Sequence, residues 1–160
     1  FNKFPELSGS NGIIAPNVIS NDDVDYIIES IHYPPKGKRG VGLGRAHKYG
    51  AEFKKYYNWQ KTEPIIIIQI ENIKALDEIE TIFNNKKIDA YLIGPYDLSA
   101  SMGIAGKFES ADFKKVLRYI KKIGNPFKEE ILFSSLSVLI ASILLRQLLK
   151  YSFTGKNSKY

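Results

Sequence analysis

The feature that most constrains the fold is an apolar run, PIIIIQI (Pro64 to Ile70), which ends in the carboxylate Glu71. Strand alternation gives this run two faces, one with Ile66, Ile68 and Ile70 and the other with Ile65, Ile67, Gln69 and Glu71. The first face is apolar throughout, and the second becomes polar only at its last two positions. Such a strand is typical of a (β/α) barrel, in which the lower side chains fill the interior and the carboxyl end faces a site.

Strands and helices alternate along most of the chain. Besides the strand above, near-continuous apolar character predicts strands over Gly12–Val18 and Ala90–Gly94. Helical spacing predicts three helices: one capped by Ser20 or Asn21 (Val24, Ile27, Ile28, Ile31), one capped by Asn72 (Ile73, Leu76, Ile79, Phe83), and one capped by Ser110 over Ala111–Ile123 (Phe113, Val116, Leu117, Ile120). We therefore expect an α/β fold with about three βα units and parallel strands, a partial TIM (β/α) barrel.

Two stretches are less regular. Tyr33 to Gly44, YPPKGKRGVGLG, predicts a loop because of its prolines and glycines, and it lacks the last glycine or the Lys-Ser/Thr pair of a phosphate-binding loop. Arg45 to Asn58 predicts a helix rich in Tyr and Lys, with weak helical periodicity.

The C-terminal part differs from the rest. Ile131 to Leu145, ILFSSLSVLIASILL, carries no charge and is followed by a basic tail. Three interpretations remain open: a buried or interface-forming apolar helix, a sequence altered by a frameshift, and a short membrane anchor, although a spanning helix needs about 18 to 20 residues. The sequence predicts two segments, an α/β domain over 1–124 and an apolar and basic segment over 125–160.

Composition excludes several classes of protein. The net charge is +6, but four of the 23 basic residues lie in the last fifteen positions, which leaves 19 against 17 acidic residues in the body. A nucleic-acid-binding face is therefore not expected, and the lysine row of the Ala111–Ile123 helix predicts a solvated face. With no Cys there is no disulfide or thiolate site. We see no signal peptide and expect a cytoplasmic protein.

Two acids mark the candidate site. Glu71 ends one predicted strand, and Asp97 lies in a turn after the next, within DAYLIGPYDLSASMG (Asp89 to Gly103). Carboxylates at adjacent strand ends can hold Mg²⁺ or Mn²⁺, hard cations that prefer oxygen ligands. Spacing alone leaves a second interpretation open, in which each acid caps a helix or bonds a loop. His32 and His47 are assigned surface or packing roles, and Ser99 and Ser101 lack a His-Asp relay.

Three blocks together resemble the HpcH/HpaI aldolase family, the metal-dependent class II pyruvate aldolases of the phosphoenolpyruvate/pyruvate barrel superfamily. They are YPPKGKRGVGLGRAHKYG (Tyr33 to Gly50), IIQIEN (Ile67 to Asn72) and IGPYDLSASMGIAG (Ile93 to Gly106). GIIAPNV (Gly12 to Val18) resembles the family's preceding strand. The resemblance covers roughly residues 11 to 124, in family order.

The resemblance implies roles for matching positions. Glu71 and Asp97 match the metal ligands, with Mg²⁺, Mn²⁺ or Co²⁺ as the cofactor. Gln69 matches a substrate-contacting glutamine, and the backbone N–H groups of Tyr96 and Asp97 would bind the carboxylate of pyruvate. The implied reaction is cleavage of a 4-hydroxy-2-oxo acid to pyruvate and an aldehyde, in which the metal acts as a Lewis acid on the 2-oxo acid and stabilises the pyruvate enolate.

The same resemblance implies missing parts. The family's general-base histidine, its aspartate partner and an enolate-stabilising arginine lie on earlier strands, and no residue here matches them, so no catalytic residue is assigned. The alternative function is therefore an inactive aldolase fragment or paralogue that keeps at most metal or pyruvate binding, or oligomerisation. The intact family implies a homo-oligomer and a small 2-oxo acid as partner. A membrane role is not expected.

Overall fold

A computed structural model describes residues 10–61, 64–124 and 129–131 of the chain. The chain divides into two compact units, Phe1–Glu130 and Ile131–Tyr160. Only Ile131 of the second unit is among the described residues, so the predicted apolar helix lies outside them. The two-segment division predicted at residue 124 stays a prediction. No helix in the described ranges is long and apolar enough to cross a membrane.

The first unit is built on a sheet of four strands in the order β1-β2-β3-β4. These are β1 (Gly12–Ala15), β2 (Ile65–Ile70), β3 (Ala90–Ile93) and the short β4 (Glu129–Ile131). β1 and β2 are parallel, with Ile13 opposite Ile66, and β2 and β3 are parallel, with Ile68 opposite Tyr91. The three predicted strands and their parallel pairing are confirmed. β4 was not predicted, because its acidic residues resemble no buried strand.

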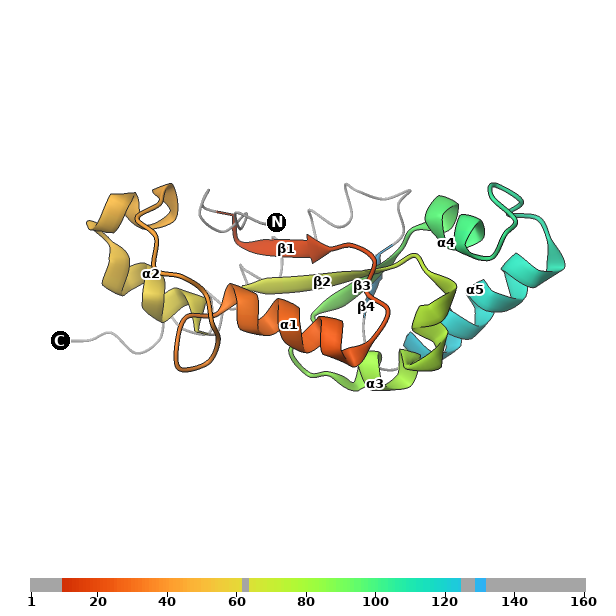
Figure 1. The fold of residues 1–160 in the computed structure, drawn as a ribbon, viewed down its shortest axis with the longest axis horizontal. Coiled ribbons are helices and arrows are strands. Elements are labelled where there is room, and N and C mark those ends of the chain that lie inside the picture. Colours follow the sequence, from red (N-terminus) through yellow and green to blue (C-terminus); the bar gives the residue numbers. More distant parts are fainter. Residues whose placement is uncertain (1–9, 62–63, 125–128, 132–160) are drawn as a thin grey trace, which may run out of the picture. The chain divides into compact units, whose positions relative to one another are not determined.

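Helices follow each of the first three strands. The main ones are α1 (Asn21–Ile31), α3 (Ile79–Asn84) and α5 (Ala111–Gly124), and they lie along one side of the sheet (Figure 1). α3 contacts both α1 and α5, so the helices follow the order of the strands. The short α4 (Pro95–Ser101) lies beyond the carboxyl end of β3. This alternation is an α/β fold of the kind predicted.

The core lies between the sheet and this helix layer. One face of each strand supplies it with Ala15, Ile66, Ile68, Ile70, Tyr91 and Ile93, and the helices supply Val24, Ile28, Ile31, Ile79, Ile82, Phe83, Phe113 and Ile120. Burying a side chain of this size contributes about 1.5–3 kcal/mol relative to leaving it exposed. The opposite face of β2 carries Ile65, Ile67 and Gln69, as alternation predicts.

Serine side chains at the N-termini of α1 and α5 explain where these two helices begin. Ser20 caps α1 in a capping box: its hydroxyl accepts the Asp23 N–H at 3.2 Å, and the Asp23 carboxylate accepts the Ser20 N–H at 3.1 Å. Ser110 caps α5 by accepting the Phe113 N–H at 3.2 Å. Of the two caps proposed for the first helix, Ser20 is therefore the one used.

Two predicted helices differ from the structure. The helix expected after Asn72 is a 3-10 helix, η3 (Ile73–Asp77), followed by α3, and the break falls at Glu78. Its buried residues are Ala75, Ile79, Ile82 and Phe83, whereas Ile73 and Leu76 are only half-buried.

The helix expected over Arg45–Asn58 is likewise divided, into η2 (Arg45–Gly50) and α2 (Phe53–Gln60). Lys48 and Tyr49 have φ values of 49° and 53°, which interrupt a regular helix.

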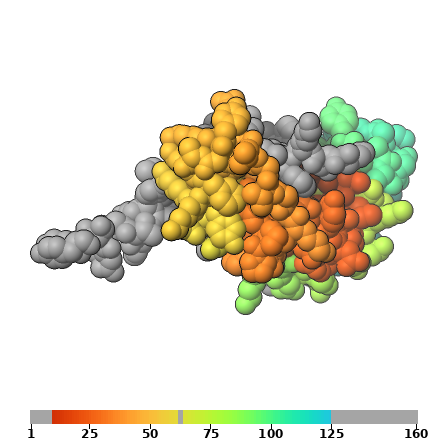
Figure 2. Space-filling model, turned by 60° about the vertical axis from the view of Figure 1, so that its left-hand side comes forward, coloured from red at the N-terminus to blue at the C-terminus, as the bar shows by residue number. Residues whose placement is uncertain are grey.

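A buried aromatic and polar cluster fixes α2 to the end of α1. Gln60 donates to the Ile31 carbonyl at 2.7 Å and so satisfies one of the last carbonyls of α1. The Arg39 guanidinium lies 4.7 Å from the centre of the Tyr33 ring and donates to the Tyr56 hydroxyl at 3.2 Å. In Figure 2 the orange-to-yellow surface of the loop, η2 and α2 is continuous with that of α1.

Gly124, one residue beyond the predicted helix Ala111–Ile123, is the last residue of α5 and is buried. A Cβ at this position would lie 2.8 Å from the Tyr91 ring and 2.9 Å from the Phe83 ring. Both rings are fully buried, so neither has room to move. The glycine is thus required for close packing of α5 against the sheet.

We expect Gly124→Ala to lower the free energy of unfolding by about 1–3 kcal/mol, because overpacking a filled core costs this much. Chemical denaturation followed by circular dichroism measures the change. Gly40→Ala is the matched control, since a Cβ there meets nothing within 4 Å. A Gly124→Ala protein as stable as the wild type would contradict the packing argument.

Candidate active site

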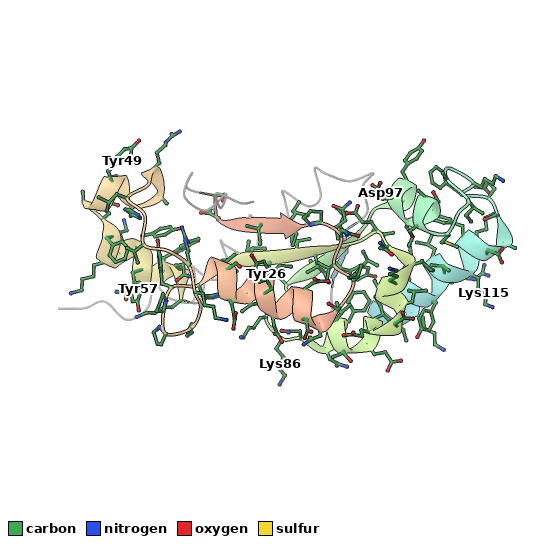
Figure 3. All side chains as sticks on the ribbon, viewed as in Figure 1. Tyr26, Tyr49, Tyr57, Lys86, Asp97 and Lys115 are labelled. Atoms are coloured by element: carbon green, nitrogen blue, oxygen red, sulfur yellow. The ribbon has the colours of Figure 1, made fainter. Side chains whose placement is uncertain are left out.

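The carboxyl ends of the three parallel strands bring three polar residues to one edge of the sheet. Asn17 follows β1, Glu71 follows β2 directly, and Asp97 follows β3 after a Gly-Pro pair. This is the edge at which parallel α/β folds bind ligands. In Figure 3 Asp97 lies at the beginning of α4, above this edge.

Glu71 is held by two donors. Its Oε1 accepts the backbone N–H of Asn17 at 2.8 Å, and its Oε2 accepts from Gln69 Nε2 at 2.5 Å. Gln69 and Glu71 are two residues apart in the chain and therefore point to the same side of the strand. The Asn72 side chain donates to Asn17 Oδ1 at 3.4 Å and the Val18 N–H donates to the Gln69 carbonyl at 3.3 Å, so three hydrogen bonds join the ends of β1 and β2.

Asp97 lies in the first turn of α4, whereas we predicted a turn at this position. Pro95 occupies the beginning of the helix, where its missing N–H costs no hydrogen bond. Leu98 and Ser99 are fully buried, while Tyr96 and Asp97 are exposed. The Asp-Leu-Ser sequence thus combines one exposed acid with two buried anchors.

Hydrogen bonds of two serines fix α4 to its surroundings. Ser99 Oγ donates to the Tyr96 carbonyl at 2.9 Å and accepts the Gly106 N–H at 3.0 Å. Ser101 Oγ donates to the Leu98 carbonyl at 2.7 Å and accepts the Ile73 N–H, just after β2, at 2.9 Å. Both serines have these structural partners, which agrees with our expectation that neither is a hydrolase nucleophile.

The two carboxylates interact with each other. The pKa of Glu71 is raised above its ordinary value, first by burial and also by the negative charge of Asp97. The hydrogen bonds from Asn17 and Gln69 act in the opposite direction. The folded chain therefore holds a partly buried acid beside a second acid, an arrangement that a cation between them would relieve.

Gly94 leaves the space that this pair needs. A Cβ at position 94 would lie 2.7 Å from Glu71 Oε2 and 2.8 Å from Gln69 Nε2. Any other residue would push both side chains away from their positions. The glycine of the Gly-Pro pair is therefore a requirement of the Glu71 site, and its φ of −92° is one that any residue adopts.

The structure places the remaining predicted residues as follows. Gln69 bonds Glu71 and lies within the site. Tyr96 and Asp97 are in the first turn of α4, where backbone N–H groups have no acceptor within the helix. Tyr96 packs edge-on against Phe108, with ring centres 4.8 Å apart.

Neither histidine is at the acid pair. His47 is fully buried, and its ring bonds the Gly42 carbonyl at 2.8 Å and the Gly50 N–H at 2.9 Å. His32 lies at the end of α1 and bonds the Ile28 carbonyl at 2.9 Å.

The residues present fit a divalent cation held with few protein ligands. Within the described ranges no group of three or more His, Asp or Glu side chains could hold a metal. Two facing carboxylates remain, and Mg²⁺ is commonly bound by one or two carboxylates together with waters and substrate oxygens.

Asn17 was missed by reasoning from the sequence. Its φ of 52° is left-handed, a conformation that Asn adopts more readily than most residues. The Pro-Asn pair after an apolar strand was the available signal, because such pairs favour turns.

Comparison with known proteins decides the family. The sequence profile of the HpcH/HpaI aldolase/citrate lyase family matches residues 7–153. The chain belongs to this family. The match extends beyond the resemblance that we recognised, at both ends.

Similar proteins with assigned names support the same family. The chain is 32% identical over 123 residues to the hydroxypyruvate/pyruvate aldolase of Roseobacter denitrificans, covering 75% of this chain and 48% of that protein. It is 36% identical over 98 residues to the 4-hydroxy-2-oxovalerate aldolase of Novosphingobium aromaticivorans, covering 61% and 37%. The chain thus spans less than half the length of each of these two relatives. The family comprises aldolases and citrate lyases by its description, and both of these relatives are aldolases by name.

Solved structures agree on the fold. A family member from Burkholderia cenocepacia J2315 superposes with a TM-score of 0.72 at 21% identity, covering 94% of this chain and 66% of that one. The HpcH/HpaI aldolase from Desulfitobacterium hafniense DCB-2 gives a TM-score of 0.66 at 22% identity, with the same coverage. The described α/β unit is therefore a partial TIM-barrel-like fold, as predicted.

We expect Glu71→Gln to stabilise the fold at neutral pH without divalent cations. The raised pKa of Glu71 means that the folded protein holds this proton more tightly than the unfolded chain does. The contribution to stability is fully present below pH 4.5, the ordinary value, and is lost as the pH rises through the raised pKa. Thermal unfolding of wild type and variant across this range measures the difference.

The variant should be more stable at neutral pH and equal to the wild type in acid. Gln at position 71 can still accept from Asn17, and Gln69 can rotate its amide to present an oxygen. Glu80→Gln, at an exposed position of α3, is the control and should show no such pH dependence. If Glu71→Gln lost the same stability at every pH, the conclusion that the charge of Glu71 destabilises the folded protein would be wrong.

Proposed function

We propose that this chain carries the metal- and pyruvate-binding half of a class II aldolase that cleaves a 4-hydroxy-2-oxo acid to pyruvate and an aldehyde. The observation that supports this most directly is the pair Glu71 and Asp97, two interacting carboxylates at the ends of adjacent parallel strands. Family membership supports the reaction class, and the names of the relatives support pyruvate as the shared product.

Glu71 and Asp97 would hold the cation, either Mg²⁺ or Mn²⁺, with Co²⁺ as a further possibility. When bound, the metal would supply Lewis-acid polarisation of the 2-oxo carbonyl. Asn17 and Gln69 would orient the Glu71 carboxylate, since each donates to one of its oxygens. A cation would also offset the burial and the Asp97 charge that together raise the pKa of Glu71.

The beginning of α4 would bind the substrate carboxylate. The N–H groups of Tyr96 and Asp97 have no acceptor within the helix, and two adjacent donors suit a carboxylate. Gln69 would contact the substrate from the β2 side. Burial of Leu98 and the bonds of Ser99 and Ser101 would keep these donors in a fixed position.

Proton transfer is the step for which the described residues offer no group. His32 lies by the amino end of β2, and His47 is buried in the loop before α2, so neither lies near Asp97. This observation favours the second candidate, a chain that binds metal and pyruvate without turnover. Pyruvate release from a 4-hydroxy-2-oxo acid, followed with a coupled lactate dehydrogenase assay, separates the two candidates. A homo-oligomer and a cytoplasmic location stay predictions.

Calorimetric titration tests the site. We expect Mn²⁺ to bind the folded chain, and pyruvate or oxalate to bind only in its presence. Glu71→Gln and Asp97→Asn should each weaken Mn²⁺ binding by about tenfold or more, because carboxylate charge dominates affinity at oxygen sites.

Asp112→Asn, at an exposed acid of α5, is the matched control and should bind like the wild type. Unchanged Mn²⁺ affinity in both site variants would exclude the assignment. Loss of affinity with full retention of the circular dichroism spectrum would support it.

We expect Gly94→Ala to weaken Mn²⁺ binding and to lower the stability of the fold. The added methyl group meets the ends of the Glu71 and Gln69 side chains and also lies 2.8 Å from Glu71 Cβ, which cannot move without the backbone. The same calorimetric titration, together with a thermal melt, measures both effects. A variant that binds Mn²⁺ as well as the wild type would show that the position of Glu71 is not set by Gly94.

A further inference from the structure

A pocket lies at the end of the strands opposite to Glu71 and Asp97. Its volume is about 490 Å³. Pro64, just before β2, and Ile66, near the beginning of β2, form part of its wall. The end of α1, Lys36 in the loop after it, Lys61 just after α2 and the link before β3 form the rest of the lining. Glu71 and Asp97 are at the carboxyl ends of β2 and β3, so the two sites are separated by the length of the strands. In Figure 3 Lys86 marks the link and Asp97 marks the other end.

The lining is strongly basic. It includes four lysines, one histidine and one acid: Lys36, Lys61, Lys86, Lys87, His32 and Asp89. The three ion pairs found between described residues use other lysines, namely Lys38, Lys48 and Lys114. Among the described lining residues, the positive charge of the pocket thus exceeds its negative charge.

The one acid of the lining already has a structural partner. Asp89 Oδ2 accepts the backbone N–H of Ile66 at 2.9 Å, a bond that joins the beginnings of β2 and β3. Lys36 and Lys61 are fixed near the rim, because Lys36 Nζ donates to the Lys61 carbonyl at 3.1 Å. The Lys61 ammonium lies 4.3 Å from the centre of the Tyr57 ring. These contacts hold two ammonium groups at the pocket without neutralising them.

His32 responds to the same charge. Its Nδ1 lies 2.9 Å from the Ile28 carbonyl and therefore carries the proton of the neutral ring, which leaves Nε2 as the site of a second proton. The pKa of His32 is lowered, first by burial and then by the charges of Lys36, Lys87 and Arg39. The positive charges around the pocket therefore disfavour a second proton, and with it a positive charge, on His32.

We propose that this pocket binds a small anion that carries phosphate groups. The volume is within the range of about 300–1,000 Å³ of ligand pockets. Lysine acts as a point charge and suits a multiply charged phosphate, whereas planar carboxylates are more often bound by the arginine fork. None of the described residues that line the pocket is an arginine. This site lies at the end of the sheet away from Glu71 and Asp97, and it is independent of the proposed function.

Binding of inorganic pyrophosphate to the full chain, in metal-free buffer at low ionic strength, tests the proposal. We expect saturable binding with a stoichiometry of one by calorimetry. Lys86→Gln/Lys87→Gln should weaken it by about tenfold or more, because two exposed charges of the lining are removed. Lys115→Gln/Lys122→Gln on α5 removes the same charge from exposed positions outside the pocket and should bind like the wild type.

A nuclear magnetic resonance titration of His32 gives a second readout. Bound pyrophosphate should raise the pKa of His32, because the anion offsets the charges of Lys36, Lys87 and Arg39. No binding to the folded wild-type chain would overturn the proposal. Equal weakening in the α5 variant would also overturn it, since net charge alone would then explain the effect. Glu71→Gln should leave pyrophosphate affinity unchanged, which separates this site from the acid pair.

Discussion

Burial of the Glu71 carboxylate beside Asp97 is the constraint around which this edge of the sheet is built. Burial is the first cause of the raised pKa of Glu71, the charge of Asp97 adds to it, and the parallel pairing of β2 and β3 brings the two segments to one edge. Nearly every local feature of the edge serves this placement. Asn17 and Gln69 donate to Glu71, Gly94 leaves room for it, and the buried Leu98 and Ser99 hold Asp97 outward.

The two ends of the strands carry opposite charge. Acids gather at the carboxyl ends, and lysines gather around the beginnings of β2 and β3. Strand direction explains the grouping of the acids, because parallel strands place their last residues at the same edge of the sheet. The grouping of lysines is a property of this sequence. Lys86 and Lys87 belong to the link before β3, and the fold fixes the length of this link but not its charge. A cation and an anion could therefore bind the same unit at once without competing for side chains.

Much of the fold could be predicted from local patterns. The alternation of Ile65 to Ile70, the caps Ser20 and Ser110, and the helical spacing of α1 and α5 each depend on neighbouring residues, and all were correct. Contacts made only in the folded chain account for what the sequence did not predict. The packing role of Gly124 depends on Tyr91, far along the chain, and the break at Lys48 and Tyr49 lies beside the buried His47, whose ring bonds Gly42 and Gly50. The pairing of Glu71 with Asp97 was anticipated from strand order, whereas Asn17 required the backbone conformation to be seen.

The bond between Ser101 and Ile73 has a consequence for the geometry of the acid pair. Ser101 is in the same short helix as Asp97, and Ile73 is two residues beyond Glu71, so a single hydrogen bond of 2.9 Å ties the two chain segments that carry the acids. A thermal displacement of either segment is transmitted to the other. The bond therefore helps to hold the two acids in a constant relative position, through a hydroxyl group that bonds neither of them.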